Sequence, residues 1–310
     1  MDLKKILYDI YEDIKPCIGQ GLVADYIPEL AKVDPDHFGM SIALPDGNVY
    51  SVGDFDVFFS VQSISKVFLL TMVLQNFGDD VWKRIGREPT GWSFDSIIQL
   101  EYEHGVPRNP FVNAGSIVMA DMMLEGISTD CAIENFLIFM RKISDDQSIY
   151  IDSIVADSEI STGYRNYALA NSIHSYRNLN HNIEDVLKVY FNHCAIVMNC
   201  AQLARSGLYL SCRGFDPLIN QHIISPQHCK FINSLMLTCG HYDNSGDFAC
   251  RVGLPGKSGV GGGILAVVPS KASIAVWSPG LNKAGNSLLG ANALELLSSK
   301  TGWSIFDFQQ

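Results

Sequence analysis

The sequence predicts an α+β protein in which one antiparallel sheet is built from both ends of the chain and a helical lobe is inserted between them. Strand patterns occur near both termini, whereas signals between about residues 63 and 210 are mostly helical. Repeats, low-complexity segments and linker composition are absent from the sequence. We therefore expect a single domain over 1–310, with an α/β lobe of about 1–60 plus 240–310 and a helical lobe of about 61–239.

The two ends of the chain supply the strands and their covering helices. Apolar residues at helical spacing predict an amphipathic helix over about 2–15, and two alternating runs around a Pro-Asp-Gly-Asn turn predict a β-hairpin over 38–52. Near the carboxyl end, two apolar runs flank a short turn and predict a second strand pair over 264–277. A last amphipathic helix is expected from about 287 to 300, with Gly302 beyond its end.

The middle of the chain is expected to be helical because capping residues precede its apolar runs. Asn113, Thr129, Asn182 and Asn199 each stand where a helix N-cap is expected, and Gln202 lies three residues after Asn199 as in a capping box. The predicted helices that follow these caps cover 114–119, 131–142, 183–191 and 200–210.

Composition excludes several classes of function. The chain has 310 residues, is 47% hydrophobic and carries a net charge of −11 without a basic patch, so nucleic acid is not an expected partner. The eight cysteines form no Cys-x-x-Cys pair and no His-Glu-x-x-His occurs, so no metal or cofactor is expected. The sequence shows neither an export signal nor an apolar run long enough for a membrane span, and we expect a cytoplasmic protein without a membrane partner.

Ser63 and Lys66 are the strongest candidates for chemistry. One helical turn places their side chains on the same face, and the residues after Lys66 are apolar on every side, which indicates a buried helix. Burial disfavours the charged amine, so Lys66 could accept the proton of the Ser63 hydroxyl. The structural alternative is an N-cap serine followed by a solvated lysine.

A glycine-rich segment over 253–263 contains the second candidate, Lys257. A phosphate loop would require glycine at Arg251 and a following helix, whereas more glycines and a strand follow. The segment is therefore either a plain glycine-rich loop or the Lys-[Ser/Thr]-Gly element that lies beside the Ser-x-x-Lys helix in penicillin-recognising enzymes. The literal Lys300-Thr301-Gly302 is interpreted as a helix stop.

With these motifs placed, the chain resembles the serine-dependent glutaminases from about Asp25 to Phe306. The resemblance implies a β-lactamase/transpeptidase-like fold, release of ammonia from L-glutamine without a cofactor, and a homodimer or homotetramer. It is carried by Asp25-Tyr26-Ile27-Pro28, Ser63-Ile64-Ser65-Lys66, Pro89-Thr90-Gly91, Val112-Asn113-Ala114-Gly115, Ser158-Glu159 with Arg165-Asn166, Tyr190-Phe191-Asn192-His193-Cys194, Tyr242-Asp243 with Ser245-Gly246, and Val252-Gly253-Leu254-Pro255-Gly256-Lys257-Ser258-Gly259-Val260.

The resemblance also implies catalytic roles. Ser63 would attack the carboxamide carbon and form an acyl-enzyme, and Lys66 would take the hydroxyl proton. Tyr242 would relay a proton to the departing ammonia, and Lys257 would keep the site positive and help hold Lys66 neutral. Backbone N–H groups of Ser63 and Val260 would hold the oxyanion. Ser63, Tyr242 and Val260 would also contact the substrate.

Further residues would bind the amino-acid part of the substrate. Glu159 suits the ammonium group, and Asn113, Asn166, Tyr190 and Tyr26 can donate hydrogen bonds to the carboxylate and the amide. Taken singly, each has a structural explanation: a helix cap for Asn113, a solvated acid for Glu159 and core positions for the tyrosines. Their joint occurrence in the family order favours the binding role.

The sequence departs from the family pattern in two places, and two other functions stay open. Ala195 stands where the family usually has Ser, which could weaken network contacts, and 211–217 replaces a glycine- and asparagine-rich turn, a difference we expect to be structural. A β-lactamase or transpeptidase would be exported and would carry Ser-Asp-Asn, for which 190–192 and 242–244 are only partial substitutes. A non-enzymatic ligand sensor would not need Ser63, Lys66 and Lys257 together.

Overall fold

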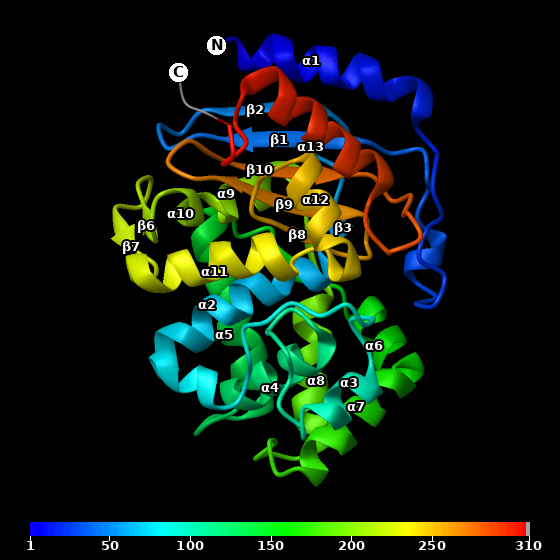
Figure 1. Cartoon of the computed structure of the whole chain (residues 1–310), viewed down its shortest axis with the longest axis vertical. Coiled ribbons are helices and arrows are strands. Elements are labelled where there is room, and N and C mark those ends of the chain that lie inside the picture. The colour runs from blue at the N-terminus through cyan, green and yellow to red at the C-terminus, as the bar shows by residue number, and fades with distance from the viewer. Residues whose placement is uncertain (308–310) are drawn as a thin grey trace.

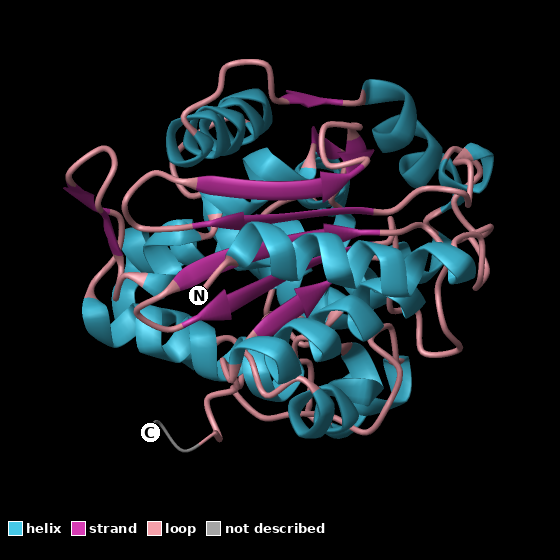
Figure 2. Cartoon of the chain, turned by 90° about the horizontal axis from the view of Figure 1, so that it is seen from above, coloured by secondary structure: helices cyan, strands magenta, loops and turns pink. Residues whose placement is uncertain are grey.

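A five-stranded antiparallel sheet forms the centre of the computed structural model, which describes residues 1–307. Its strand order is β2-β1-β10-β9-β8, and Figure 2 shows the strands side by side between helices. The strands are β1 (Gly39–Ala43), β2 (Val49–Gly53), β8 (Gly256–Ser258), β9 (Gly263–Val268) and β10 (Ala272–Trp277). The sheet therefore combines a hairpin from the amino end with three strands from the carboxyl end. The hairpin, β9 and β10 are predicted by the sequence, and β8 extends the predicted pair by one strand.

Both faces of this sheet are buried, because alternate side chains of each strand enter different cores. Ile264 and Ala266 of β9 pack with α1 (Leu3–Ile14) and α13 (Leu288–Thr301), whereas Leu265 belongs to the core shared with the helical part. In Figure 1, α1 and α13 lie on one side of the sheet and α2, α9 and α11 lie on the other. Lys257 lies on β8, an edge strand of this sheet, which agrees with the Lys-[Ser/Thr]-Gly alternative and not with a plain loop.

The helical part surrounds α2, which is buried from Ser65 to Leu74 as its apolar sequence predicts. The short helical turn η3 (Gln62–Ile64) leads into α2, and η5 (Tyr242–Asn244) leads into α12. The remaining helices are α2 (Ser65–Phe77), α3 (Ile97–Tyr102), α4 (Asn113–Met123), α5 (Thr129–Ser144), α6 (Ser153–Thr162), α7 (Tyr164–Ser175), α8 (Ile183–Cys194), α9 (Cys200–Ser206), α10 (Leu208–Ser211), α11 (Pro226–Cys239) and α12 (Ser245–Arg251).

Two predicted helix caps are confirmed and two are wrong. Asn182 caps α8, and Asn199 and Gln202 form the capping box of α9. Asn113 is already the first residue of α4, and its side chain bonds Lys66 and Asn166 instead of the helix backbone. At α5 the capping oxygen comes from Ser128, one residue before the predicted Thr129.

The structure also contains short elements that the sequence analysis did not predict. The predicted helix over 200–210 is divided at Gly207, where a Cβ would lie 2.4 Å from Ser273 Oγ. A three-stranded sheet has the order β3-β5-β4, with β3 (Phe59–Ser60), β4 (Tyr150–Ile151) and β5 (Ile196–Met198). Runs of two or three residues are too short to produce a recognisable alternation.

The segment 211–217, which replaces the usual turn, begins a small hairpin of β6 (Phe215–Asp216) and β7 (Gln221–His222). The two terminal guanidinium nitrogens of buried Arg205, Nη1 and Nη2, donate to the carboxylate of Asp216 at 2.7 and 3.1 Å. This bidentate ion pair fixes the hairpin on α9 and gives the segment a structural role.

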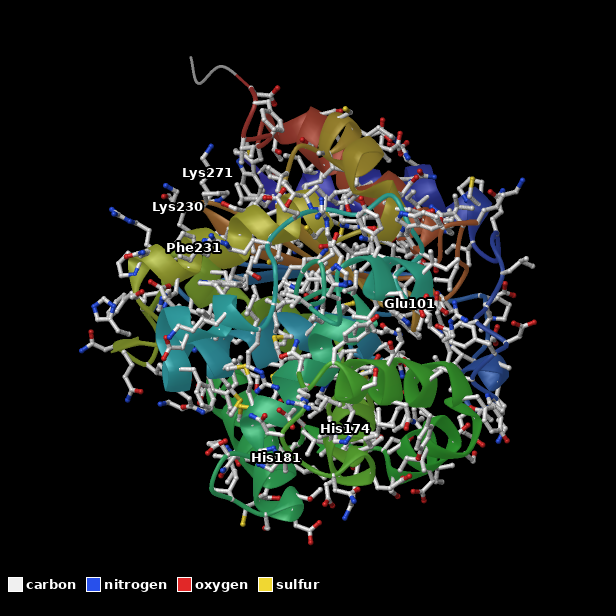
Figure 3. The ribbon with its side chains drawn as sticks, turned by 60° about the horizontal axis from the view of Figure 1, so that its bottom comes forward. Glu101, His174, His181, Lys230, Phe231 and Lys271 are labelled. Atoms are coloured by element: carbon white, nitrogen blue, oxygen red, sulfur yellow. The ribbon has the colours of Figure 1, made fainter. Side chains whose placement is uncertain are left out.

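Figure 3 views the molecule with the helical part turned forward. Lys230 and Phe231 project from α11, and Lys271 lies in the turn between β9 and β10, whereas His174 and His181 lie in the helical region. Over residues 1–307, none of the helices has the length and apolar character needed to cross a lipid bilayer.

Candidate active site

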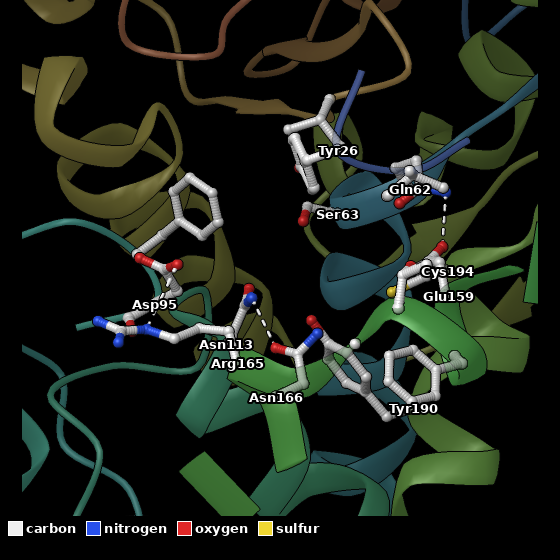
Figure 4. A pocket seen from close by; sticks show the side chains of 16 residues that line it. Tyr26, Gln62, Ser63, Asp95, Asn113, Glu159, Arg165, Asn166, Tyr190 and Cys194 are labelled. Carbon is white, nitrogen blue, oxygen red and sulfur yellow. Dashed lines mark hydrogen bonds and ion pairs between the residues drawn. The ribbon is translucent and has the colours of Figure 1, made fainter. Parts of the chain in front are cut away.

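A cavity of about 240 Å³ opens where the helical part meets the edge of the five-stranded sheet. Its size and mixed polar lining suit a small polar molecule. Figure 4 shows side chains from several elements converging on it. The predicted residues that line it are Tyr26, Ser63, Asn113, Glu159, Asn166, Tyr190 and Val260, and the other lining residues are Ile27, Gln62, Phe94, Asp95, Thr162, Gly163, Arg165, Phe191 and Cys194.

Ser63 lies in η3, immediately before α2, and only 8% of its surface is exposed. The preceding residue, Gln62, has a φ of +51°, a backbone conformation that costs energy for a residue other than glycine. Two hydrogen bonds hold this conformation, because the Gln62 amide donates to Ser60 Oγ at 3.0 Å and to Glu159 Oε1 at 2.8 Å. The turn that presents Ser63 is thus tied to an acidic residue of the same cavity.

Lys66 is fully buried one turn after Ser63, which excludes the alternative of a solvated lysine. Its Nζ donates to Asn113 Oδ1 at 2.6 Å and to the Phe111 carbonyl at 3.4 Å, so its hydrogen bonds are made to these two groups and not to Ser63. Burial lowers the pKa of Lys66 from 10.5 to about 8. About a tenth of this amine is therefore uncharged at pH 7, far more than for an exposed lysine.

Lys257 is also fully buried, and it lies against Tyr242. Its Nζ donates to the carbonyls of Gly240 at 3.2 Å and Ser258 at 2.5 Å, and it lies 4.6 Å from the centre of the Tyr242 ring. Burial, and then the charge of Lys66, lower the pKa of Lys257 well below 10.5. The charge of Lys66 therefore disfavours the charged form of Lys257.

Tyr242 links Lys257 to Ser63. Its hydroxyl donates to the Ser258 carbonyl at 3.4 Å, and its ring packs on Phe94 with the ring centres 4.6 Å apart. Burial raises the pKa of Tyr242, and a hydrogen bond from the Ser63 side chain opposes that rise. Tyr242 therefore stays protonated at neutral pH, and its hydroxyl lies close to the Ser63 side chain.

Glu159 of α6 supplies the one buried acid at this end of the cavity, with 6% of its surface exposed. Burial raises the pKa of Glu159 from 4.5 to about 7, and the Gln62 hydrogen bond and the nearby Lys66 oppose the rise. Burial disfavours the charged forms of both Glu159 and Lys66. A cationic ligand bound in the cavity would therefore stabilise the Glu159 carboxylate.

Amide and phenol groups complete the cavity wall. Asn113 Nδ2 donates to Asn166 Oδ1 at 3.0 Å, so Lys66, Asn113 and Asn166 form one chain of hydrogen bonds. Tyr190 is buried, with its ring centre 5.9 Å from Lys66 Nζ. Tyr26 is 55% exposed and lies beside Ser63 at the opening (Figure 4).

The glycine-rich segment approaches the backbone of Ser63 closely. A Cβ on Gly259 would lie 2.4 Å from the Val61 carbonyl and 3.4 Å from Ser63 N, so only glycine fits this position. Val260, the next residue, lines the cavity. The backbone around Val260 and Ser63 can therefore approach the same ligand atom, and no helix follows Lys257 as a phosphate loop would require.

All predicted site residues are thus brought together, but the sequence analysis assigned no role to several neighbours. Gln62 supports Glu159, and Arg165 Nε donates to the Asp95 carbonyl at 2.9 Å across the cavity wall (Figure 4). Cys194 lines the cavity, and burial raises the pKa of its thiol strongly, so it stays protonated. The only sequence signal for these residues is their position within the quoted motifs.

Two further observations limit the chemistry of the site. Ala195, which replaces the usual serine, is fully buried against Val155 and Ala156 and does not line the cavity. In the part of the chain that the structure describes, no three His, Cys, Asp or Glu side chains are grouped so that they could hold a metal ion.

Comparisons with known proteins agree with one another. A family model described as Glutaminase matches residues 21–306. A glutaminase from Rhizobium etli (strain CIAT 652) is 61% identical over 305 residues, covering 98% of this chain and 99% of the relative. The solved structure of a probable glutaminase, ybaS, has a TM-score of 0.92 and 35% identity, and covers 98% of this chain and 99% of its own.

A second solved structure is that of a probable glutaminase from Bacillus subtilis complexed with 6-diazo-5-oxo-L-norleucine. Its TM-score is 0.90 at 32% identity, with coverage of 99% of this chain and 98% of that chain. The matches place this chain among the amidohydrolases. It belongs to the glutaminase family.

Proposed function

We propose that this protein hydrolyses L-glutamine to L-glutamate and ammonia through an acyl-enzyme on Ser63. The observation that carries the mechanism is the burial of Lys66 one turn after a partly accessible Ser63, with its pKa lowered to about 8. A serine hydroxyl is a weak nucleophile until a neighbouring base removes its proton, and Lys66 is the base closest in sequence and on the same helical face.

In the first half of the reaction, Ser63 Oγ bonds to the side-chain carboxamide carbon while Lys66 accepts the hydroxyl proton. The negative charge that develops on the carboxamide oxygen is held by the backbone N–H groups of Ser63 and Val260, each contributing about 3 kcal/mol of transition-state stabilisation. The C–N bond then breaks as Tyr242 passes its proton to the nitrogen, Tyr242 regains a proton from the Lys66 ammonium, and ammonia leaves. When Lys257 is charged, it makes this side of the cavity positive and favours the uncharged form of Lys66.

In the second half, water adds to the ester carbon on Ser63 as Lys66 takes one of its protons, the C–Oγ bond breaks, that proton passes from Lys66 to Ser63 Oγ, and glutamate leaves. The buried Glu159 carboxylate pairs with the substrate ammonium, and Asn113, Asn166, Tyr190 and Tyr26 donate to its carboxylate and amide. The supporting observation is that these polar side chains line one cavity of about 240 Å³. When a free amino acid is buried, its ammonium group and its carboxylate each need a charged or hydrogen-bonding partner.

The finer architecture and the setting of the protein also belong to this proposal. We propose a β-lactamase/transpeptidase-like fold in one domain. The chain would pass from the α/β lobe to the helical lobe near residue 60 and return near residue 240. We propose a homodimer or homotetramer, which the family resemblance implies, and a cytoplasmic location, which the sequence predicts. Size-exclusion chromatography with light scattering tests the oligomeric state, since a monomer across micromolar concentrations would contradict it.

Ammonia release from L-glutamine by the Ser63→Ala variant tests the mechanism. We expect kcat to fall by about 10⁴-fold or more, because the nucleophile is lost while the cavity is kept. Ser298→Ala is the matched control. Ser298 lies in α13, away from the cavity, and the substitution removes a buried hydroxyl that donates to the Val252 carbonyl. Unchanged glutamine turnover in Ser63→Ala would reject the acyl-enzyme, and glutamine binding without turnover in the unaltered protein would favour a sensor.

A further inference from the structure

Tyr242 is held in a backbone conformation that an aromatic residue rarely adopts. Its φ is +57°, in the left-handed region, where the Cβ of an L-residue crowds the backbone. This conformation places the Tyr242 ring over Lys257 and its hydroxyl near Ser63. Because a strained conformation persists only when its surroundings determine it, some neighbouring group must hold the turn.

The hydroxyl of Ser245 is positioned to hold this turn from both sides. It accepts a hydrogen bond from the His241 backbone N–H at 3.0 Å and donates one to the Tyr242 carbonyl at 3.0 Å. Ser245 is buried, with 6% of its surface exposed, so water competes poorly for these bonds. One side chain therefore joins the Gly240–His241 peptide group to the Tyr242–Asp243 peptide group, so it bridges the backbone across His241 and Tyr242.

The surroundings fix the same turn at its amino side. Asn286 Nδ2 donates to the His241 carbonyl at 3.3 Å, and the His241 ring stacks on Phe248 with the ring centres 3.5 Å apart. Ser245 is the first residue of α12, but its hydroxyl does not cap that helix, whose N-cap position is Asn244 without a side-chain cap bond. The Ser245 hydroxyl is thus committed to the turn that carries Tyr242.

We infer that Ser245 is a positioning residue for the proton transfer to ammonia, acting through Tyr242. This inference rests on the proposed function, because it assigns to Ser245 the placement of the hydroxyl that protonates the leaving nitrogen. Without the Ser245 hydroxyl, the turn can relax to a less strained backbone conformation and carry the Tyr242 hydroxyl away from Ser63. Substrate binding is affected less, because Glu159 and the asparagines lie on other elements.

A double-mutant cycle on kcat for L-glutamine tests the inference, using Ser245→Ala, Tyr242→Phe and the double variant. We expect Tyr242→Phe to lower kcat by about 100-fold, the lower end of what a positioned proton donor contributes. Ser245→Ala should lower kcat by about tenfold with KM changed less than about threefold, and it should add less than about twofold in the Tyr242→Phe background. Ser298→Ala, which also loses one buried hydroxyl, should keep kcat within about twofold.

The outcomes separate this inference from the proposed function. A kcat within twofold of the unaltered protein in Ser245→Ala, beside an impaired Tyr242→Phe, would overturn the inference alone, as would full additivity in the double variant. Normal turnover in Tyr242→Phe would refute the relay and the inference together. If Ser245→Ala does not fold, Ser245→Cys keeps the side-chain size with a weaker hydrogen-bonding group, and the same cycle should then show a smaller, still non-additive loss.

Discussion

The two regions that contact the five-stranded sheet bury different kinds of side chain, with opposite effects on stability. Between the sheet and α1 and α13, buried apolar side chains such as Ile42, Ile274 and Leu294 pack against one another. At the sheet edge facing α2, the structure buries the ionisable groups of Lys66, Lys257 and Glu159. The first arrangement removes apolar surface from water, which stabilises the fold.

The second arrangement opposes stability, because taking charged groups out of water is unfavourable. Its effect is to shift the pKa of Lys66 downward and that of Glu159 upward, toward neutral pH. Ionisable groups with such shifts are useful for proton transfer and for binding an oppositely charged ligand. The comparison therefore predicts that changes in the apolar layer alter stability and changes in the polar cleft alter activity.

The largest expected effect is on activity, in Lys66→Met. The substitution removes the base while keeping most of the side-chain volume, and we expect kcat for L-glutamine to fall by about 10³-fold or more. The free energy of unfolding should change by less than about 2 kcal/mol, because removing a buried amine offsets the loss of its hydrogen bonds to Asn113 and the Phe111 carbonyl. Ammonia release and urea unfolding measure the two quantities; a large loss of stability with retained turnover would break the comparison.

The next effect is on stability, in Leu294→Ala. Leu294 of α13 is fully buried in the apolar layer, and we expect the free energy of unfolding to fall by about 2–5 kcal/mol because a cavity is created. At a temperature where the variant is folded, kcat and KM should stay within about twofold of the unaltered protein. Ile138→Ala is the surface control, since Ile138 is 52% exposed. A selective loss of kcat in Leu294→Ala would show that the two regions are not separate.

A smaller effect is the dependence of kcat/KM on pH. Glu159 must be ionised to pair with the substrate ammonium and Lys66 must be neutral to accept a proton, with pKa values of about 7 and about 8. Both groups reach their active form as pH rises, so kcat/KM should fall by about tenfold per pH unit below pH 8 and more steeply below pH 7.

Glu159→Gln sharpens this test. The variant should have a lower kcat/KM, because a neutral amide pairs weakly with the substrate ammonium. It should lose the steeper limb below pH 7, and the remaining inflection should move below 8, because the Glu159 carboxylate raises the pKa of Lys66. A profile of kcat/KM that rises as the pH falls from 8 to 6 would contradict these protonation states.

Much of the fold could be predicted because its elements carry local signals. The alternation in β9 and β10 and the caps Asn182 and Asn199 needed no distant contact to be recognised. Asn113 was predicted wrongly for a physical reason. An asparagine before an apolar run suits an N-cap, but here its side chain bonds Lys66, 47 residues earlier in the chain.

The candidate site divides in the same way. The spacing of Ser63 and Lys66 and the family motifs named the residues that converge on the cavity, since they lie close together in sequence or in a recognised order. Gln62 supports Glu159 across 97 residues of chain, and Ser245 acts on backbone groups of a strained turn. Such contacts depend on tertiary structure, and neither residue type signals them in the sequence.

The central claim is that Ser63, activated by a buried uncharged amine, is the nucleophile. Intact-mass analysis and peptide mapping after incubation with 6-diazo-5-oxo-L-norleucine test it most directly, because Cys194 lines the same cavity and offers an alternative nucleophile. The account predicts one stoichiometric adduct, on Ser63, because the protonated Cys194 thiol stays unreactive. The adduct should form more slowly in Lys66→Met, because that variant lacks the base. An adduct on Cys194, or equal labelling of the Ser63→Ala variant, would contradict it.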